Sequence, residues 1–182
     1  MKNQMIHTTL AAFLAGASFL PVTLPNLAAA AESPFAVRMN TMEIDGLTIA
    51  YREAGDPSNP TVLLLHGFPT SSHMFRELIP ELAGKYHVIA PDYPGFGASE
   101  MPDAKDYDYS FANAADVVTK LIDARGVTDY AVYLMDYGAP VGYRMFAADP
   151  ARVTGFIIQN GNAYEEGLRE FWDPIKTYWA EP

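Results

Sequence analysis

One stretch of the chain, residues 130–146, combines a predicted buried strand, a tight turn and a predicted helix. Residues 130–135 form an apolar run rich in aromatic and β-branched side chains, which is typical of a buried strand. Gly138 and Ala139 follow, and the apolar spacing after them suits a helix. Asp136 lies on the turn, where a side chain is raised above the C-terminal edge of a sheet and the helix N-terminus favours negative charge. Asp136 is therefore a candidate nucleophile.

Several other apolar runs predict the strands that would surround this one. Residues 61–65 form a continuous apolar run, as expected of a strand covered on both faces, and residues 86–90 and 153–158 are predicted to be further strands. Near the N-terminal side, Asp45-Gly46 separates two alternating segments, 42–44 and 47–51. A two-residue Asp-Gly connection between such segments predicts a β-hairpin.

Helical patterns separate the predicted strands. One begins near His73, with Phe75, Leu78, Ile79 and Leu82 on a single face, and Gly84 ends it. A second follows the capping residue Ser110 and ends at Gly126. Strand and helix alternate from residue 61 onward, which predicts an α/β fold with a parallel sheet and helices on both faces.

An aspartate on such a turn can act as a nucleophile without help. An aspartate side chain ordinarily has a pKa of ~3.9, so it is ionised at neutral pH, whereas a serine would need an adjacent base. Asp136 could then attack an electrophilic sp³ carbon, opening an epoxide or displacing a halide, and form an alkyl ester. The alternative is that Asp136 only caps the following helix, because aspartate is a good capping residue.

The first 31 residues have the layout of a secretory signal peptide. Lys2 precedes an apolar run at residues 10–20, and Ala29 and Ala31 form an A-x-A arrangement before Glu32. This pattern predicts cleavage near Ala31 and export of the remaining chain. An N-terminal membrane anchor is an alternative, but the apolar run is shorter than the ~20 residues that span a bilayer. A disordered leader is the other alternative.

Composition restricts the partners that the chain can have. Its net charge is −10, and loss of Lys2 with the leader gives −10 − 1 = −11, a charge that repels nucleic acid and anionic membranes. The absence of cysteine excludes disulfides, a thiolate nucleophile and a cysteine metal site. We expect a small neutral apolar substrate, water as the second reactant, and no cofactor or metal. Apolar residues make up 49% of the chain, enough for one domain with a core.

Three motifs in order give the chain a family resemblance. They are His66-Gly67-Phe68-Pro69, residues 92–99 with the sequence DYPGFGAS, and Asp136-Tyr137-Gly138-Ala139. From about Met42 to Gly161 the chain resembles the first part of an α/β-hydrolase. Within that superfamily it is similar to the aspartate-nucleophile branch of epoxide hydrolases and haloalkane dehalogenases.

The resemblance implies a domain division and a set of roles. Residues 32–162 would be the N-terminal part of the hydrolase core, with its sheet truncated after about the sixth strand, and residues 163–182 the start of the cap. Phe68 and Tyr137 would donate their backbone N–H groups to an oxyanion hole, a contribution worth roughly 2.7–4 kcal/mol per donor in acyl-transfer enzymes. The residues that the resemblance places in the supporting loops are His66, Gly67, Pro69 and Gly138.

The chain also departs from the pattern of that branch. Dehalogenases usually have a tryptophan, and fluoroacetate dehalogenases an arginine, where this chain has Tyr137. The residue two before the nucleophile is usually small, and here it is Leu134. Leu134 counts against the assignment of Asp136 as the nucleophile. The differences at Tyr137 favour epoxide hydrolysis, with haloalkane dehalogenation as the alternative enzyme activity. A non-catalytic hydrolase-fold fragment or binding module is the alternative of another class.

The remaining histidines and aromatic residues receive structural assignments. His73 is expected at a helix start near the pocket, and His87 at the edge of a strand. Ser99 is expected to be a loop or capping residue. The family places its histidine base and second acid after the cap, so we expect both beyond Pro182, and no multiple turnover by this chain alone. The residues predicted to begin a cap over the pocket are Phe171, Trp172, Tyr178 and Trp179.

Overall fold

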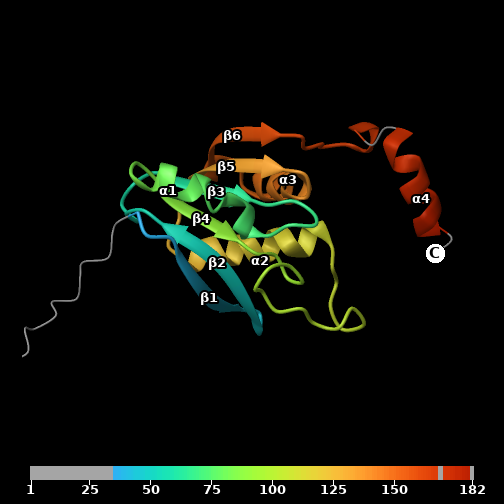
Figure 1. Cartoon of the computed structure of the whole chain (residues 1–182), viewed down its shortest axis with the longest axis horizontal. Helices are drawn as coiled ribbons and strands as arrows, with labels where there is room; N and C mark the ends of the chain where they lie inside the picture. The colour runs from blue at the N-terminus through green and yellow to red at the C-terminus, as the bar shows by residue number, and fades with distance from the viewer. Residues whose placement is uncertain (1–34, 168–169, 181–182) are drawn as a thin grey trace, which may run out of the picture. The chain divides into compact units, whose positions relative to one another are not determined.

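A six-stranded mixed sheet forms the centre of the molecule, with the strand order β1-β2-β4-β3-β5-β6 (Figure 1). The computed structural model describes residues 35–167 and 170–180, so the predicted signal peptide lies outside the described residues. The strands are β1 Arg38–Ile44, β2 Leu47–Ala54, β3 Thr61–Leu65, β4 His87–Pro91, β5 Tyr130–Met135 and β6 Val153–Gln159. The α-helices are α1 Leu78–Ala83, α2 Phe111–Ala124, α3 Gly138–Ala148 and α4 Asp173–Ala180.

The predicted hairpin is confirmed, and it is longer than the sequence pattern indicated. Strands β1 and β2 pair antiparallel, with Ile44 opposite Leu47 across the two-residue connection. Asp45 has a φ of 52° and Gly46 a φ of 81°. Both central residues therefore adopt the left-handed backbone conformation that a type I′ turn requires.

The strands from residue 61 onward are parallel to one another, as predicted. Strand β3 pairs in parallel with both β4 and β5, and β5 pairs in parallel with β6. The hairpin joins this parallel sheet through the antiparallel pair β2–β4. In the register between β3 and β5, Leu65 lies opposite Leu134. The loop after β3 and the turn after β5 therefore begin side by side at one edge of the sheet.

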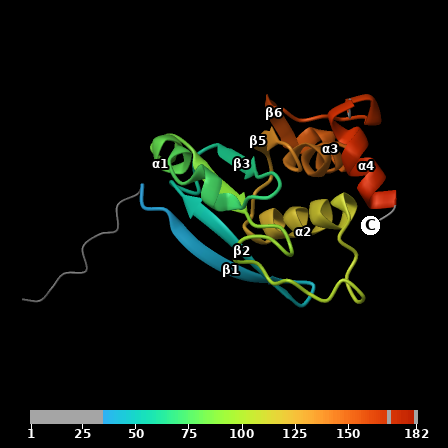
Figure 2. The same cartoon turned by 45° about the vertical axis from the view of Figure 1, so that its right-hand side comes forward.

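Helices cover both faces of the sheet, which confirms the predicted layering (Figure 2). Successive side chains of a strand point to opposite faces, so β3 contributes to two separate cores. Leu63 and Leu65 belong to the core that includes residues of α2 and α3. Leu64 belongs to the core that includes Ile79 and Ala83 of α1.

The single helix predicted from near His73 to Gly84 is wrong. A 3₁₀ turn occupies Ser72–Phe75, and α1 begins separately at Leu78. Pro80 has no N–H group to donate to the carbonyl of Arg76, which disfavours one continuous α-helix from His73 through this point. Leu78 is consequently exposed rather than part of the buried face.

Two loops at the carboxyl edge of the sheet are fixed by a buried aspartate, Asp92. Its Oδ1 accepts a hydrogen bond from the Ser72 N–H (2.6 Å), and its Oδ2 accepts one from the Ala98 N–H (2.9 Å). The Ser99 hydroxyl donates to the Asp92 carbonyl (2.6 Å). Ser99 is thus a loop residue, as predicted, and it holds the loop after β4 in place.

The large residue Leu134 is accommodated by a glycine on the adjacent helix. Leu134 is fully buried, and its Cδ2 lies 2.2 Å from the position that a Cβ atom on Gly142 would occupy. Gly138 has a similar role, because a Cβ there would lie 2.4 Å from the Leu65 carbonyl oxygen. These two glycines let α3 pack closely on β5 and β3.

We predict that Gly142→Ala destabilises the fold by about 1–3 kcal/mol, the usual cost of inserting a methyl group into a well-packed core. Urea denaturation should show a lower midpoint with an unchanged slope. Gly155→Ala is the matched control, because a Cβ on Gly155 meets nothing within 4 Å. Equal midpoints for the two variants would contradict this packing argument.

Acid should also destabilise the fold, through buried His66. Burial lowers the pKa of His66 below its ordinary value of 6.5, the carbonyl of Gly67 opposing this shift in part. The unfolded chain therefore binds more protons just below pH 6.5, and the free energy of unfolding falls as the pH drops through that value. Urea titrations at a series of pH values should show a weaker dependence in His66→Gln than in the exposed control His73→Gln. An identical pH dependence in both variants would exclude this origin.

Candidate active site

Asp136 occupies a strained turn between the end of β5 at Met135 and the start of α3 at Gly138. Its φ of 49° lies in the left-handed region, which aspartate tolerates better than most residues other than glycine. Such a conformation costs about 1–3 kcal/mol and persists only where the surrounding structure imposes it. The sharp turn that the sequence predicted at Asp136 is therefore present.

Two backbone N–H groups converge on one oxygen of Asp136. Phe68 donates to Oδ1 at 2.8 Å, and Tyr137 donates to the same Oδ1 at 2.7 Å. The hydrogen bonds that the described residues make to this carboxylate both end on Oδ1, and none of them reaches Oδ2. The structure therefore brings Asp136, Phe68 and Tyr137 together in the arrangement that the resemblance implied.

The approach of the Phe68 loop to Asp136 depends on a glycine. A Cβ atom on Gly67 would lie 2.5 Å from the Cβ of Asp136, closer than two such atoms can approach. The peptide bond between Phe68 and Pro69 is cis. The Thr70 N–H donates to the Gly67 carbonyl at 3.0 Å, which closes the loop into a tight turn.

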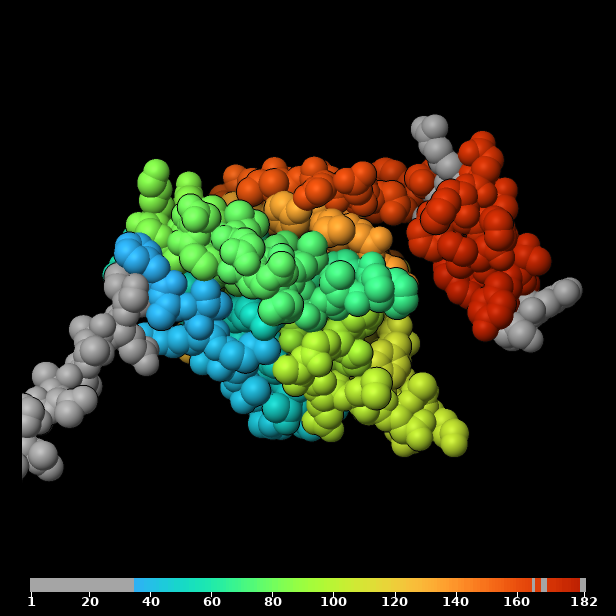
Figure 3. Space-filling view, in the orientation of Figure 1, coloured from blue at the N-terminus to red at the C-terminus, as the bar shows by residue number. Residues whose placement is uncertain are grey.

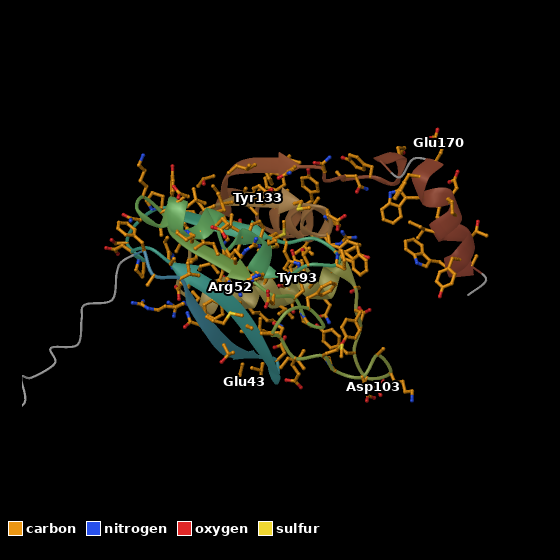
Figure 4. The ribbon with its side chains drawn as sticks, viewed as in Figure 1. Glu43, Arg52, Tyr93, Asp103, Tyr133 and Glu170 are labelled. Atoms are coloured by element: carbon orange, nitrogen blue, oxygen red, sulfur yellow. The ribbon has the colours of Figure 1, made fainter. Side chains whose placement is uncertain are left out.

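His66 lies beneath this loop and is fully buried. Its Nδ1 lies 3.0 Å from the Gly67 carbonyl oxygen, and its Nε2 accepts a hydrogen bond from the Tyr93 N–H at 3.4 Å. These partners require the proton on Nδ1 and a neutral ring. Tyr93, which is labelled in Figure 4, packs its ring against His66 and donates its hydroxyl to the His66 carbonyl. This geometry suits the predicted supporting position.

A cavity of about 380 Å³ opens beside Asp136. It contains a guanidinium group and an amide that sequence reasoning did not assign to the site. Arg144 lies seven residues after Tyr137, about two turns along α3, and this helical spacing could have placed the two residues on the same face. Asn162 follows β6, and no local pattern marks it. The principal lining residues are Asp136, Tyr137, Arg144, Asn162, Trp172 and Trp179.

The carboxylate, the guanidinium and the aromatic rings around the cavity contact one another or shift one another's pKa. Burial and the negative charge of Asp136 raise the pKa of the Tyr137 phenol, so this group keeps its proton. The Arg144 guanidinium lies 5.8 Å from the ring centre of Phe111 and donates to the Pro140 carbonyl at 2.8 Å. Phe111 in turn packs edge-to-face on Tyr137, with 4.9 Å between ring centres.

The two other histidines of the described residues, His73 and His87, do not line this cavity. His87 begins β4, as predicted, and is buried, with its Nε2 2.8 Å from Glu53 Oε1. His73 lies in the 3₁₀ turn and is exposed, with its Nδ1 3.3 Å from an Arg52 nitrogen. His73 lies at the start of that turn, as predicted, but it does not line the cavity at Asp136, and its place near the pocket stays a prediction.

The predicted cap residues fall partly in this site. Trp172 and Trp179 line the cavity, and their ring centres are 5.9 Å apart. Phe171 and Tyr178 are exposed and do not line it.

Within residues 35–167 and 170–180, no group of three or more acidic or histidine side chains is arranged to hold a metal ion. No helix in that part of the chain is long and apolar enough to cross a membrane.

The chain is similar to known hydrolases in sequence and structure. It is 54% identical over 136 residues to an uncharacterized hydrolase of Saccharomyces cerevisiae, covering 74% of this chain and 46% of the yeast protein. A haloalkane dehalogenase structure from Bradyrhizobium elkani matches with a TM-score of 0.64 and 36% identity, covering 68% of this chain and 41% of that one. A Vigna radiata epoxide hydrolase variant matches with a TM-score of 0.62 and 30% identity, covering 67% and 38%.

These relatives agree on the family. The chain spans less than half the length of each of the three proteins. The family described as the alpha/beta hydrolase fold matches residues 60–181, which include β3 to β6 and every residue of the Asp136 site. The chain therefore belongs to the α/β-hydrolase fold family, and it is related to haloalkane dehalogenases and epoxide hydrolases.

Proposed function

We propose that Asp136 is the nucleophile of a hydrolase that acts on a small, neutral, apolar electrophile, with an epoxide as the first candidate. The observation that carries this proposal is the pair of N–H groups on Oδ1, at 2.8 and 2.7 Å. They fix the orientation of the carboxylate and leave Oδ2 for attack. A carboxylate nucleophile of this kind forms a covalent ester intermediate.

The chemistry follows from the roles of the two oxygens. Oδ2 forms a bond to one epoxide carbon, the carbon–oxygen bond of the ring breaks, and the released oxygen takes up a proton from water. Oδ1 becomes the carbonyl oxygen of the ester. When water adds to Cγ and gives up a proton to solvent, negative charge develops on Oδ1, between the N–H groups of Phe68 and Tyr137; the Cγ–Oδ2 bond then breaks, the alcohol oxygen takes up a proton, and the diol and the carboxylate are released. Donors at 2.7–2.8 Å suit the stabilisation of such an oxyanion.

The leaving oxygen of an epoxide also needs a hydrogen-bond donor. Tyr137 lines the cavity, and its raised pKa keeps the phenol protonated over the ordinary pH range. Asn162 adds an amide N–H donor to the same cavity. These two groups support ring opening without a metal ion, because each can donate to the oxygen as charge develops on it.

Haloalkane dehalogenation is the second candidate, supported by the relationship to a haloalkane dehalogenase at 36% identity. Here Oδ2 displaces a halide from an sp³ carbon, and the halide needs donors in place of a proton. The indole N–H groups of Trp172 and Trp179, which line the cavity, are of the right kind. Assay of halide release distinguishes the two activities.

We predict that incubation with styrene oxide adds the epoxide to the peptide that contains Asp136, as mapped by mass spectrometry. Asp136→Asn should form no adduct and should fold normally, because asparagine tolerates the positive φ and still accepts the two N–H bonds. Asp106→Asn, a change at an exposed loop aspartate, is the matched control and should react like the unmodified chain. An equal adduct yield in Asp136→Asn would contradict the proposal.

We further predict that this chain forms at most one product molecule per chain. Among the residues that the structure describes, no histidine lines the cavity at Asp136, and a general base ordinarily contributes about 10²–10⁴-fold to the rate. Quench-flow analysis of diol formed per mole of protein measures this directly. Several turnovers that disappear in Asp136→Asn would show that another group within the chain activates water.

A further inference from the structure

Strand β6 is the outermost strand on one side of the sheet. It pairs with β5, and no strand of the described residues pairs with its other side. Figure 3 shows the orange-red atoms of this segment along one rim of the surface, and Figure 1 shows the same position in the ribbon. An edge strand presents a row of backbone N–H and C=O groups that can pair with another chain.

The side chains of β6 are apolar and exposed on both faces of the sheet. Phe156, Ile157 and Ile158 are 38%, 51% and 53% exposed. The ring of Phe156 packs on Phe146 of α3, with 5.2 Å between ring centres, so Phe156 and Ile158 lie on the face that α3 covers and Ile157 on the opposite face. Phe146 is itself exposed, and the apolar surface therefore continues from β6 onto α3.

Strand β6 lacks the features that usually prevent pairing at a sheet edge. Natural edge strands are often very short, or carry charged residues or proline. β6 has seven residues, none of them charged and none of them proline, whereas the opposite edge strand β1 carries Arg38 and Glu43. A register shift against β5 falls at Thr154, and the regular segment that follows it, residues 155–159, pairs without interruption. This regular segment is therefore open to a further strand.

The regular segment is complementary to a second copy of itself. In an antiparallel pair with a twofold axis at Ile157, each Ile157 lies opposite the other, each Phe156 lies opposite Ile158, and each Gly155 lies opposite Gln159. Pairs of aromatic and β-branched side chains stabilise antiparallel strands, and like charges opposite each other destabilise them. This register contains no charged pair, although the whole chain has a net charge of −10.

We propose that the edge of β6 is the interface of a homodimer, in which two copies pair antiparallel through residues 155–159 and join their sheets into one. The pairing satisfies backbone groups of both edges and removes the apolar side chains of both copies from water. A partner attracted by charge has no countercharge on this strand to bind. A second copy instead supplies an uncharged strand with matching side chains, and a twofold axis uses the same surface on both copies.

Cysteine cross-linking tests the register, because the chain has no cysteine of its own. Ile157→Cys should form a disulfide between two copies under mild oxidation, since the two side chains face each other across the axis. Phe156→Cys is the matched control, because its two copies lie diagonally, roughly 7–8 Å apart, beyond the reach of a disulfide. A mixture of Phe156→Cys and Ile158→Cys should cross-link, since these positions are opposite each other.

Sedimentation equilibrium of the whole chain should give twice the mass of one chain. Ile157→Lys should weaken dimerisation at least roughly tenfold, because two like charges would be buried at the axis. Ile157 is half exposed, so the lysine variant should keep the circular dichroism spectrum of the unmodified chain. Met101→Lys, the same type of change at a loop residue that is 76% exposed, is the matched control and should remain dimeric.

Three results would overturn the proposal. A monomer at the highest soluble concentration would mean that no second copy binds to β6, whether or not another segment or protein does. Equal cross-linking of Ile157→Cys and Phe156→Cys would indicate random collision rather than the proposed register. A dimer that Ile157→Lys leaves unchanged would place the interface on another surface.

Discussion

The hydrogen bonds from Phe68 and Tyr137 to a single oxygen of Asp136 depend on the pairing of two neighbouring parallel strands. Leu65, the last residue of β3, lies opposite Leu134 of β5, so the loop that contains Phe68 begins beside the turn that contains Asp136. Shifting this register by one residue would reverse the faces that the two strands bury. The site is therefore a consequence of how the sheet is assembled rather than of either loop alone.

The strain at Asp136 is maintained by packing on both sides of the turn. Leu134 fills the space left by the missing side chain of Gly142, and the backbone at Gly138 lies against β3. A turn with φ of 49° at a non-glycine residue would relax if α3 could move away from the sheet. The departure noted at Leu134 is thus compensated by Gly142 in α3, which is why a bulky residue two positions before Asp136 is compatible with this fold.

Local patterns in the sequence predicted the hairpin, the parallel strands and the turn at Asp136, because each depends on neighbouring residues. The helix near His73 was predicted wrongly, since the missing N–H of Pro80 outweighs the apolar spacing around it. The sequence did not reveal that Asn162 lines the cavity at Asp136. This property arises when segments distant in sequence meet, and no periodicity of the chain encodes it.

The geometry also bears on whether Asp136 is only a helix cap. A capping aspartate lies just before the helix in extended conformation and accepts N–H groups from the first turn. The N-cap position of α3 is instead occupied by Tyr137, whose side chain makes no capping hydrogen bond. Asp136 has a positive φ, and one of its two donors is Phe68, 68 residues earlier in the chain. These features differ from those of a helix-capping aspartate, and they support the proposal that the carboxylate of Asp136 reacts.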